Sequence, residues 1–436
     1  MAPLPLRPES AVGAPAAGAR SDGRVQGADG LRAFAACWVV GSHLFQRLDL
    51  TSQAPWLQDV QLVMMKGAFG VSIFFVLSGM LLSLPFWRAY LTGRPFPRPG
   101  QYARRRLARI APGYYLSLAV TSVVALAVGA DAPYRLARLL AGATFTSGFH
   151  WVTFFPVPIN GPLWSIGFEV VSYVLMPLAM WGLFRFRRRG TRLALGYWVV
   201  VVGLVLAVNQ WVVTTFVPDA DGRGWQYGMV GGAKEWMPSY NPVGFFAHFC
   251  VGIATAAAIT WWRLRRGARQ HWAFDVLAAA GVAGGSALTW VVREPPEPEY
   301  LTNFQGQPYR FPLFALAVAV ALVGLAHSRV LGGLVDNRVA RYVAAISFGV
   351  YVWHYLIIEM VAGRTGDFVY GGITDPGRFA ALSVLVLALT LAVASASWRW
   401  LERPVLTSRW ARGAPRTSPE APRAVEDRAP DLRPAG

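Results

Sequence analysis

The chain has 436 residues, of which 54% are hydrophobic and only 15% are charged. Soluble domains carry about 25% charged residues, so this chain lacks the charge to cover the two or three soluble domains that its length would otherwise predict. The formal net charge is +18, and 39 of the 41 basic residues are arginines. On so hydrophobic a chain this excess indicates a membrane surface or an anionic ligand rather than nucleic acid. Cys37 and Cys250 are the only cysteines, which excludes a disulfide scaffold and a cysteine metal cluster, and no metal site is predicted.

Ten apolar stretches follow one another between two polar tails. Each is about 18 to 25 residues long, enough to cross ~30 Å of hydrocarbon as an α-helix. They are residues 31–48, 67–87, 112–130, 163–184, 193–217, 242–262, 273–292, 312–331, 342–362 and 378–400. We therefore predict one all-α integral membrane domain over residues 29–404. The flanking segments 1–28 and 405–436 are rich in Pro and Arg and are predicted to be disordered tails.

The segments between these stretches alternate in charge. If the N-terminus is cytoplasmic, the segments on that side hold 31 of the 41 basic residues and the opposite segments hold 10. Lys and Arg are retained on the cytoplasmic side of inserted helices, so the pattern predicts a multi-pass protein of the cell membrane with both termini in the cytoplasm. The net charge is then +21 inside and −1 outside, which directs an anionic ligand to the cytoplasmic face.

Three of the apolar stretches carry ionisable residues on stripes at helical spacing, and such residues are costly in a membrane and by default mark a functional interior or a paired site. Arg32 and His43 share the first stretch, ~16 Å apart along a helix axis at ~1.5 Å per residue. Glu169 follows a helical stripe of serines in the fourth stretch, and His354 lies one turn after Tyr351 in the ninth. Counting along the helices places His43, Glu169 and His354 at similar depth in the outer half.

A histidine, a carboxylate and a second histidine at one depth suit general-base catalysis. An imidazole takes a proton from a hydroxyl group, and a carboxylate fixes its tautomer and stabilises the imidazolium. We predict His43 as the base and Glu169 as the carboxylate that orients it. The alternative is that these side chains are hydrogen-bonding groups between helices, and His354, which lies close to two tyrosines, fits either description.

Two further segments, one basic and one with small residues, can serve either the structure of the protein or the binding of a substrate. Arg106 and Arg109, just before the third stretch, lie on one helix face and can grip a phosphate, although basic residues at a cytoplasmic helix end are also routine anchors. Ser78 and Gly79 lie in the middle of the second stretch. Close helix packing is the default role for such small residues, which can also leave room for an acyl chain.

These segments together resemble the acyltransferase-3 family of polytopic bacterial O-acyltransferases. The similar segments are Asp29-Gly-Leu-Arg32 followed by His43, Phe69 through Ser78-Gly79, Arg106-Leu-Ala-Arg109 with Tyr114-Tyr115, Trp164-Ser165-Ile-Gly-Phe-Glu169, Tyr351-Val-Trp-His354 and Glu402-Arg403-Pro404. The resemblance spans about 29–404, nearly everything between the tails. Two positions depart from it, since the family usually has an aspartate-like residue where Ser72 stands and Phe where Met80 stands.

The resemblance implies an enzyme that moves an acetyl or longer acyl group from a cytosolic acyl-CoA co-substrate, with no bound cofactor, to a hydroxyl of a sugar-containing acceptor. Cell-surface glycans, glycolipids and glycosylated metabolites are all acceptors of this class. On this hypothesis Arg106, Arg109 and Arg32 hold the phosphates and the pantetheine end of the donor. Ser78 then lies beside the acyl chain, and His43 deprotonates the acceptor hydroxyl.

The remaining steps leave alternatives. Tyr351, His354 and Trp164 are the candidate hydrogen-bond donors to the tetrahedral oxyanion. Direct transfer to the acceptor and transfer through an acyl-histidine both fit the sequence. A proton-coupled polytopic transporter is the alternative function, because ten helices with buried His and Glu also suit ion flux, although we find no inverted repeat. The acceptor's identity, the acyl length and the oligomeric state stay open.

Overall fold

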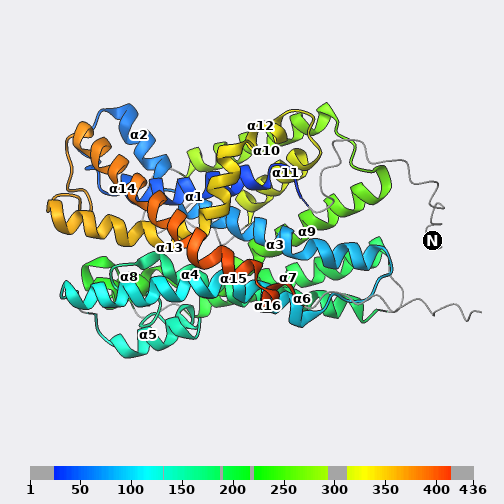
Figure 1. Ribbon diagram of the computed structural model, residues 1–436, viewed down its shortest axis with the longest axis horizontal. Coiled ribbons are helices and arrows are strands. Elements are labelled where there is room, and N and C mark those ends of the chain that lie inside the picture. Colours follow the sequence, from blue (N-terminus) through cyan, green and yellow to red (C-terminus); the bar gives the residue numbers. More distant parts are fainter. Residues whose placement is uncertain (1–23, 131, 187–189, 217–219, 293–311, 414–436) are drawn as a thin grey trace, which may run out of the picture.

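The computed structural model describes residues 24–130, 132–186, 190–216, 220–292 and 312–413. Within them the chain forms helices and no strand, with one isolated parallel bridge between Leu48 and Ile373. Most long helices run along the long axis of one bundle (Figure 1). The α-helices are α1 (Ala28–Phe45), α2 (Pro55–Met64), α3 (Ala68–Leu91), α4 (Pro99–Ala127), α5 (Arg135–Ala143), α6 (Trp164–Phe184), α7 (Thr191–Thr215), α8 (Gly228–Trp236), α9 (Pro242–Arg266), α10 (Trp272–Val291), α11 (Leu313–His327), α12 (Leu331–Val335), α13 (Arg338–Thr365), α14 (Pro376–Ser397), α15 (Arg403–Thr407) and α16 (Arg409–Arg412). The short 3₁₀ helices are η1 (Ser147–Phe149), η2 (Gly161–Leu163) and η3 (Trp225–Tyr227), and η5 (Trp398–Glu402) is a π-helix.

Each of the ten predicted apolar stretches coincides with one helix, which confirms the all-α architecture. By length and composition, eight helices of the described chain can cross a membrane, two fewer than predicted. The two that fall short are α1 and α11. α11 has 15 described residues, and α1 carries the polar residues Asp29, Arg32 and His43. α1 packs against α3 and α13, so its polar side chains are partly covered by protein.

The helices differ in how far other helices cover them. α3, α9 and α13 are mostly buried, whereas α7, α10 and α14 are mostly exposed. The exposed surface of α7 presents large apolar side chains, including Leu195, Val199 and Leu204. Extended apolar surface of this kind marks contact with a membrane, so the chain fits a multi-pass membrane protein with α3, α9 and α13 at its centre.

α3 and α9 meet at two glycines. A Cβ on Gly79 would lie 2.1 Å from the carbonyl oxygen of Phe249, and a Cβ on Gly252 would lie 2.1 Å from that of Val76. Side-chain carbons do not approach backbone oxygen this closely, so both positions require glycine. The close contact explains Gly79 in the second apolar stretch, and it leaves the preceding Ser78 free to face another neighbour.

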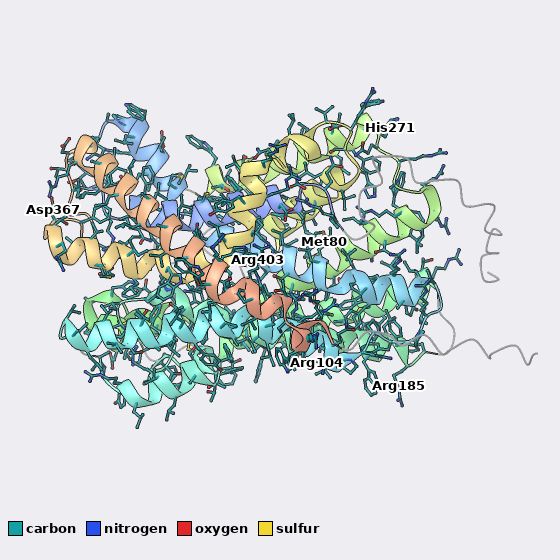
Figure 2. All side chains as sticks on the ribbon, in the orientation of Figure 1. Met80, Arg104, Arg185, His271, Asp367 and Arg403 are labelled. Carbon is teal, nitrogen blue, oxygen red and sulfur yellow. The ribbon has the colours of Figure 1, made fainter. Side chains whose placement is uncertain are left out.

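The two ends of the bundle carry different charge. Arg104, Arg185 and His271 lie toward one end, and Asp367 lies at the other (Figure 2). Segments 92–98 and 263–271, which connect helices at the first end, contain six arginines. We call this the arginine-rich end and the other the opposite end. The distribution follows the alternation that the sequence predicted.

The helical bundle extends beyond the predicted domain of 29–404. Val25 is fully buried, and α15 and α16 pack against α4, where the Gln101 side-chain amide donates to the carbonyl oxygen of Arg412. Residues 24–28 and 405–413 therefore belong to the folded bundle rather than to tails. The remainder of both predicted tails lies outside the described residues.

Candidate functional site

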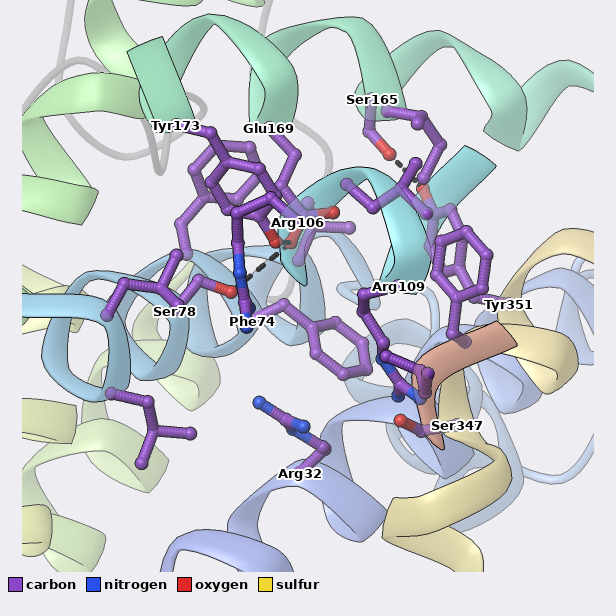
Figure 3. A pocket seen from close by; sticks show the side chains of 18 residues that line it. Arg32, Phe74, Ser78, Arg106, Arg109, Ser165, Glu169, Tyr173, Ser347 and Tyr351 are labelled. Carbon is purple, nitrogen blue, oxygen red and sulfur yellow. Dashed lines mark hydrogen bonds between the residues drawn. The ribbon is translucent and has the colours of Figure 1, made fainter. Parts of the chain in front are cut away.

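A cavity of about 360 Å³ lies inside the bundle between α1, α3, α4, α6 and α13 (Figure 3). Small-molecule sites typically measure about 300–1,000 Å³, so the cavity is large enough for a ligand of that class. Six of the nine predicted site residues line it, namely Arg32, Ser78, Arg106, Arg109, Glu169 and Tyr351. His43, Trp164 and His354 are not among its lining residues.

The arginines of the cavity come from the halves of α1 and α4 that are nearest the arginine-rich end. Arg32, Arg106 and Arg109 are half-buried and face the cavity, whereas Arg104 and Arg105 of the same basic cluster are exposed. Within the described chain Arg32 and Arg106 have no ion-pair or hydrogen-bond partner. The cavity is lined by three guanidinium groups and one carboxylate, that of Glu169, and this excess of positive charge favours an anionic ligand.

Arg109 is held by the end of the domain. Its Nη1 lies 3.8 Å from Oε2 of Glu402, which is fully buried, and its guanidinium carbon lies 5.3 Å from the centre of the Trp398 ring. The Ser397 hydroxyl donates to the other carboxylate oxygen of Glu402 at 3.0 Å. Trp398 and Glu402 bound a π-helix, a feature found frequently at functional sites. Glu402 therefore positions Arg109, a role that the sequence alone did not assign to it.

Glu169 lies in the cavity, where the structure does not bring it together with His43. The hydroxyl of Ser78 donates to Oε1 of Glu169 at 3.2 Å, and the hydroxyl of Tyr173 donates to the same oxygen. Within the described residues no hydrogen bond joins Glu169 to His43. Counting residues gives the depth of a side chain along its helix, but it does not say which neighbouring helix the side chain faces. Tyr173 was missed, although its i+4 spacing from Glu169 places the two on one helix face.

His43 pairs instead with His354. Nε2 of His354 lies 3.1 Å from Nδ1 of His43, which is also 2.9 Å from the carbonyl oxygen of Val39. Nδ1 of His354 lies 2.8 Å from the carbonyl oxygen of Tyr351 and 3.1 Å from that of Val350, so this nitrogen carries the proton and Nε2 accepts. Both neighbours of His43 Nδ1 are then acceptors, which places its proton on Nδ1. The neutral His43 ring therefore presents an unprotonated Nε2, the form that a general base requires.

Tyr351 lines the cavity and contacts His354, and Phe74 packs against Tyr351 in the cavity wall. The ring centres of Tyr351 and His354 are 6.0 Å apart, and those of Phe74 and Tyr351 are 6.3 Å apart. The Tyr351 hydroxyl donates to the carbonyl oxygen of Pro162 at 3.0 Å and lies 2.6 Å from the hydroxyl of Ser165. Its proton is thus already engaged by the backbone, so Tyr351 acts here as a wall residue rather than as a ready oxyanion donor.

Trp164 packs in an aromatic cluster beside the cavity. Its ring centre lies 5.2 to 5.5 Å from those of Phe154, Phe168, Tyr240 and Phe245. The cluster joins the start of α6 to α9 and to the segment that precedes α6. The structure therefore gives Trp164 a packing environment and does not bring it to the cavity with the other predicted binding residues.

A family model described as an acyltransferase domain matches residues 25–396. Peptidoglycan O-acetyltransferase OatA of Listeria monocytogenes is 25% identical over 390 residues, which cover 86% of this chain and 55% of the relative. Nodulation protein 10 of Rhizobium leguminosarum is 24% identical over 418 residues, covering 91% and 98%. The putative peptidoglycan O-acetyltransferase YrhL of Bacillus subtilis is 25% identical over 405 residues, covering 88% and 55%. The chain thus spans about half the length of the two peptidoglycan O-acetyltransferases, and no solved structure matches it.

Proposed function

Because the chain belongs to the acyltransferase-3 family, we propose that it moves an acyl group from acyl-CoA to a hydroxyl of a sugar-containing acceptor, with His43 as the general base. The observation that carries this proposal is one cavity lined by three arginines, next to a histidine pair in which Nε2 of His43 is unprotonated. The relatives named O-acetyltransferases favour an acetyl group, and the two named for peptidoglycan favour a cell-envelope glycan. Family membership favours this enzyme over the transporter alternative.

The donor binds in the cavity on this proposal. The phosphates of acyl-CoA bind to Arg32 and Arg106, the two guanidinium groups of the cavity without an ion-pair partner among the described residues. Glu402 holds Arg109 beside them. The acyl thioester extends past Ser78, whose hydroxyl is fixed by Glu169. Because the arginines derive from helix segments near the arginine-rich end, the donor enters from that end.

The chemistry is direct acyl transfer. Nε2 of His43 takes the proton of the acceptor hydroxyl while the oxygen attacks the thioester carbonyl carbon. The tetrahedral intermediate then expels the CoA thiolate, which takes the proton from the His43 imidazolium. His354 accepts from Nδ1 of His43 throughout and keeps the ring oriented. The thioester reaches His43 when the ring of Phe74 or Tyr351 rotates out of the cavity wall.

The proposed topology places the arginine-rich end in the cytoplasm, together with both chain termini. In this arrangement α1 and α11 cross the membrane with the eight longer or more apolar helices, which gives ten crossings. The positive-inside distribution of arginine supports it. His43 lies near the opposite end of α1, so the acceptor approaches from outside the cell.

The test is transfer of radiolabelled acetyl-CoA to the host's cell-envelope extract by purified protein in lipid nanodiscs. His43→Ala should lower transfer by about 10²–10⁴-fold, the usual contribution of a general base. His150→Ala, at an exposed histidine in the segment between α5 and α6, is the matched control and should transfer at the wild-type rate. Wild-type transfer by a folded His43→Ala protein would remove His43 from the mechanism.

A further inference from the structure

Arg47, one helical turn beyond His43, is a buried cation that the proposed mechanism does not use. It is 1% exposed. Its Nη2 donates to Oε1 of Glu359 at 2.7 Å, and its guanidinium carbon lies 4.5 Å from the centre of the Tyr370 ring. Within the described residues its buried Nε has no hydrogen-bond partner. Burying a charge with incomplete pairing costs stability, so the position of Arg47 beside His43 calls for a functional explanation.

The groups around Arg47 form a surface that opens outward at the opposite end of the bundle. We call Arg47, Tyr355, Glu359 and Tyr370 the tyrosine platform. Tyr370 is 60% exposed, with Arg47 against one face of its ring. The Glu359 side chain is 28% exposed, and no hydrogen bond within the described chain reaches its Oε2. The platform therefore offers a ligand an exposed tyrosine ring and the carboxylate oxygen of Glu359 that is not bonded to Arg47.

The platform is continuous with His43. The ring of Tyr355 packs edge-on against that of His43 with centres 5.1 Å apart, and the Tyr355 hydroxyl lies 3.1 Å from that of Tyr370. His43 is itself partly exposed, whereas His354 behind it is fully buried. His43 thus contacts the tyrosine platform through Tyr355 and the buried His354 on another side, and His354 in turn contacts Tyr351 of the cavity.

The platform is held in a fixed position. The amide of Ile373 donates to the carbonyl oxygen of Arg47 at 3.1 Å, and the amide of Asp49 donates to that of Ile373 at 2.8 Å. The amide of Gly371 donates to the carbonyl oxygen of Gln46 at 3.0 Å. These bonds tie the loop between α13 and α14, which carries Tyr370, to the end of α1. Tyr370 and His43 therefore keep one spacing before any ligand arrives, as a preorganised site requires.

We propose that the tyrosine platform binds a sugar ring of the acceptor and presents one of its hydroxyls to His43. This inference rests on the proposed function for the identity of the ligand as the acceptor. The exposed Tyr370 ring gives the apolar face of a sugar a flat surface, while Oε2 of Glu359 accepts from a sugar hydroxyl. Arg47 pairs with Glu359 and supports the Tyr370 ring from behind. A sugar bound there lies next to Tyr355, whose ring contacts that of His43.

The test measures sugar binding without acyl-CoA, so it does not depend on catalysis. The full chain is reconstituted in lipid nanodiscs free of sugar-headed detergent, which would compete for the site. Chitopentaose and maltopentaose are titrated separately by calorimetry into the wild type, Tyr370→Ala and Glu359→Gln. Each variant should bind about tenfold more weakly, a loss of ~1.4 kcal/mol. Tyr370→Phe keeps the ring and should bind as the wild type does.

The control is Tyr227→Ala, at a tyrosine that is also 60% exposed but lies in η3, outside the tyrosine platform. It should leave sugar binding unchanged, and equal unfolding temperatures establish that the variants are folded. Wild-type affinity in Tyr370→Ala and Glu359→Gln, or no binding of either sugar to the wild type at millimolar concentration, would overturn the proposal. Sugar binding at the platform without acyl transfer would refute the proposed function and leave the platform in place.

Discussion

Gly79→Ala tests whether the packing of α3 on α9 sets the geometry of the cavity. The added methyl group would lie 2.1 Å from the carbonyl oxygen of Phe249 and 3.0 Å from its carbonyl carbon. Non-bonded heavy atoms prefer about 3.5 Å, and backbone atoms cannot rotate away, so the two helices must separate by about 1 Å. Overpacking of this kind costs about 1–3 kcal/mol. Because Ser78 precedes Gly79, the movement also disturbs its 3.2 Å hydrogen bond to Glu169.

The assay combines thermal unfolding of the purified protein with the KM for acyl-CoA. Gly79→Ala should unfold at a lower temperature than the wild type and require more acyl-CoA, because the thioester channel beside Ser78 is displaced. Gly203→Ala in α7 is the matched control, since a Cβ there meets nothing within 4 Å. It should be neutral or stabilising by up to ~1 kcal/mol, the helix-propensity gain of Ala over Gly. The reasoning fails if Gly79→Ala behaves like Gly203→Ala in both measurements.

Three further predictions concern charged groups. Arg106→Ala should raise the KM for acyl-CoA about tenfold, by losing a charge-assisted contact to phosphate, and leave the KM for the acceptor unchanged; an equal rise in both would contradict phosphate binding. Glu402→Ala leaves Arg109 without its carboxylate partner and should lower the free energy of unfolding by about 3 kcal/mol. This is the lower end of the range for a buried pair, because the Arg109 side chain is 17% exposed. An unchanged unfolding temperature would count against the pairing. The Arg378 guanidinium holds the pKa of Asp367 below its usual range, so this ion pair stabilises the loop above the usual pKa and is lost only as pH falls through the lowered value. Oligosaccharide binding should therefore be the same at about pH 7 and about pH 5. A loss of binding across that interval would contradict the role of the Arg378–Asp367 ion pair in holding the loop.

The helices were the most predictable part of the fold. A membrane helix must be apolar over its whole crossing, so each of the ten stretches could be read directly from the sequence, and each is a helix in the structure. The exception is α1, whose polar side chains lower its mean hydropathy although the helix packs against α3 and α13. Hydropathy measures how well a segment suits lipid. It therefore does not identify a membrane helix whose polar side chains face other helices.

The site was predictable where helical spacing decides it. Arg106 and Arg109 face the cavity together, as their spacing on one helix face indicates. The pairing of Glu169 with Ser78 rather than with His43 depends on how α3 packs against α6 and α9, which in turn depends on backbone contact at Gly79. Contacts of this kind join segments far apart in the chain, and no local pattern records them.

The contact between Arg109 and Glu402 shows the same limit. Arg109 comes from α4 and Glu402 from the last part of the domain, and the π-helix that brings them together has no local signature in the sequence. The tyrosine platform depends likewise on a bridge between Leu48 and Ile373, which joins the end of α1 to the last loop of the bundle.

Transfer across a sealed membrane tests the central claim that donor and acceptor approach His43 from opposite ends. Membrane vesicles of both orientations are prepared from cells that make the protein, and labelled acetyl-CoA, which does not cross the bilayer, is added outside. Inside-out vesicles expose the proposed cytoplasmic end to the label and should acylate the envelope glycan enclosed in their lumen, whereas right-side-out vesicles should not acylate theirs. Equal labelling in both orientations, or labelling only in right-side-out vesicles, would contradict the account.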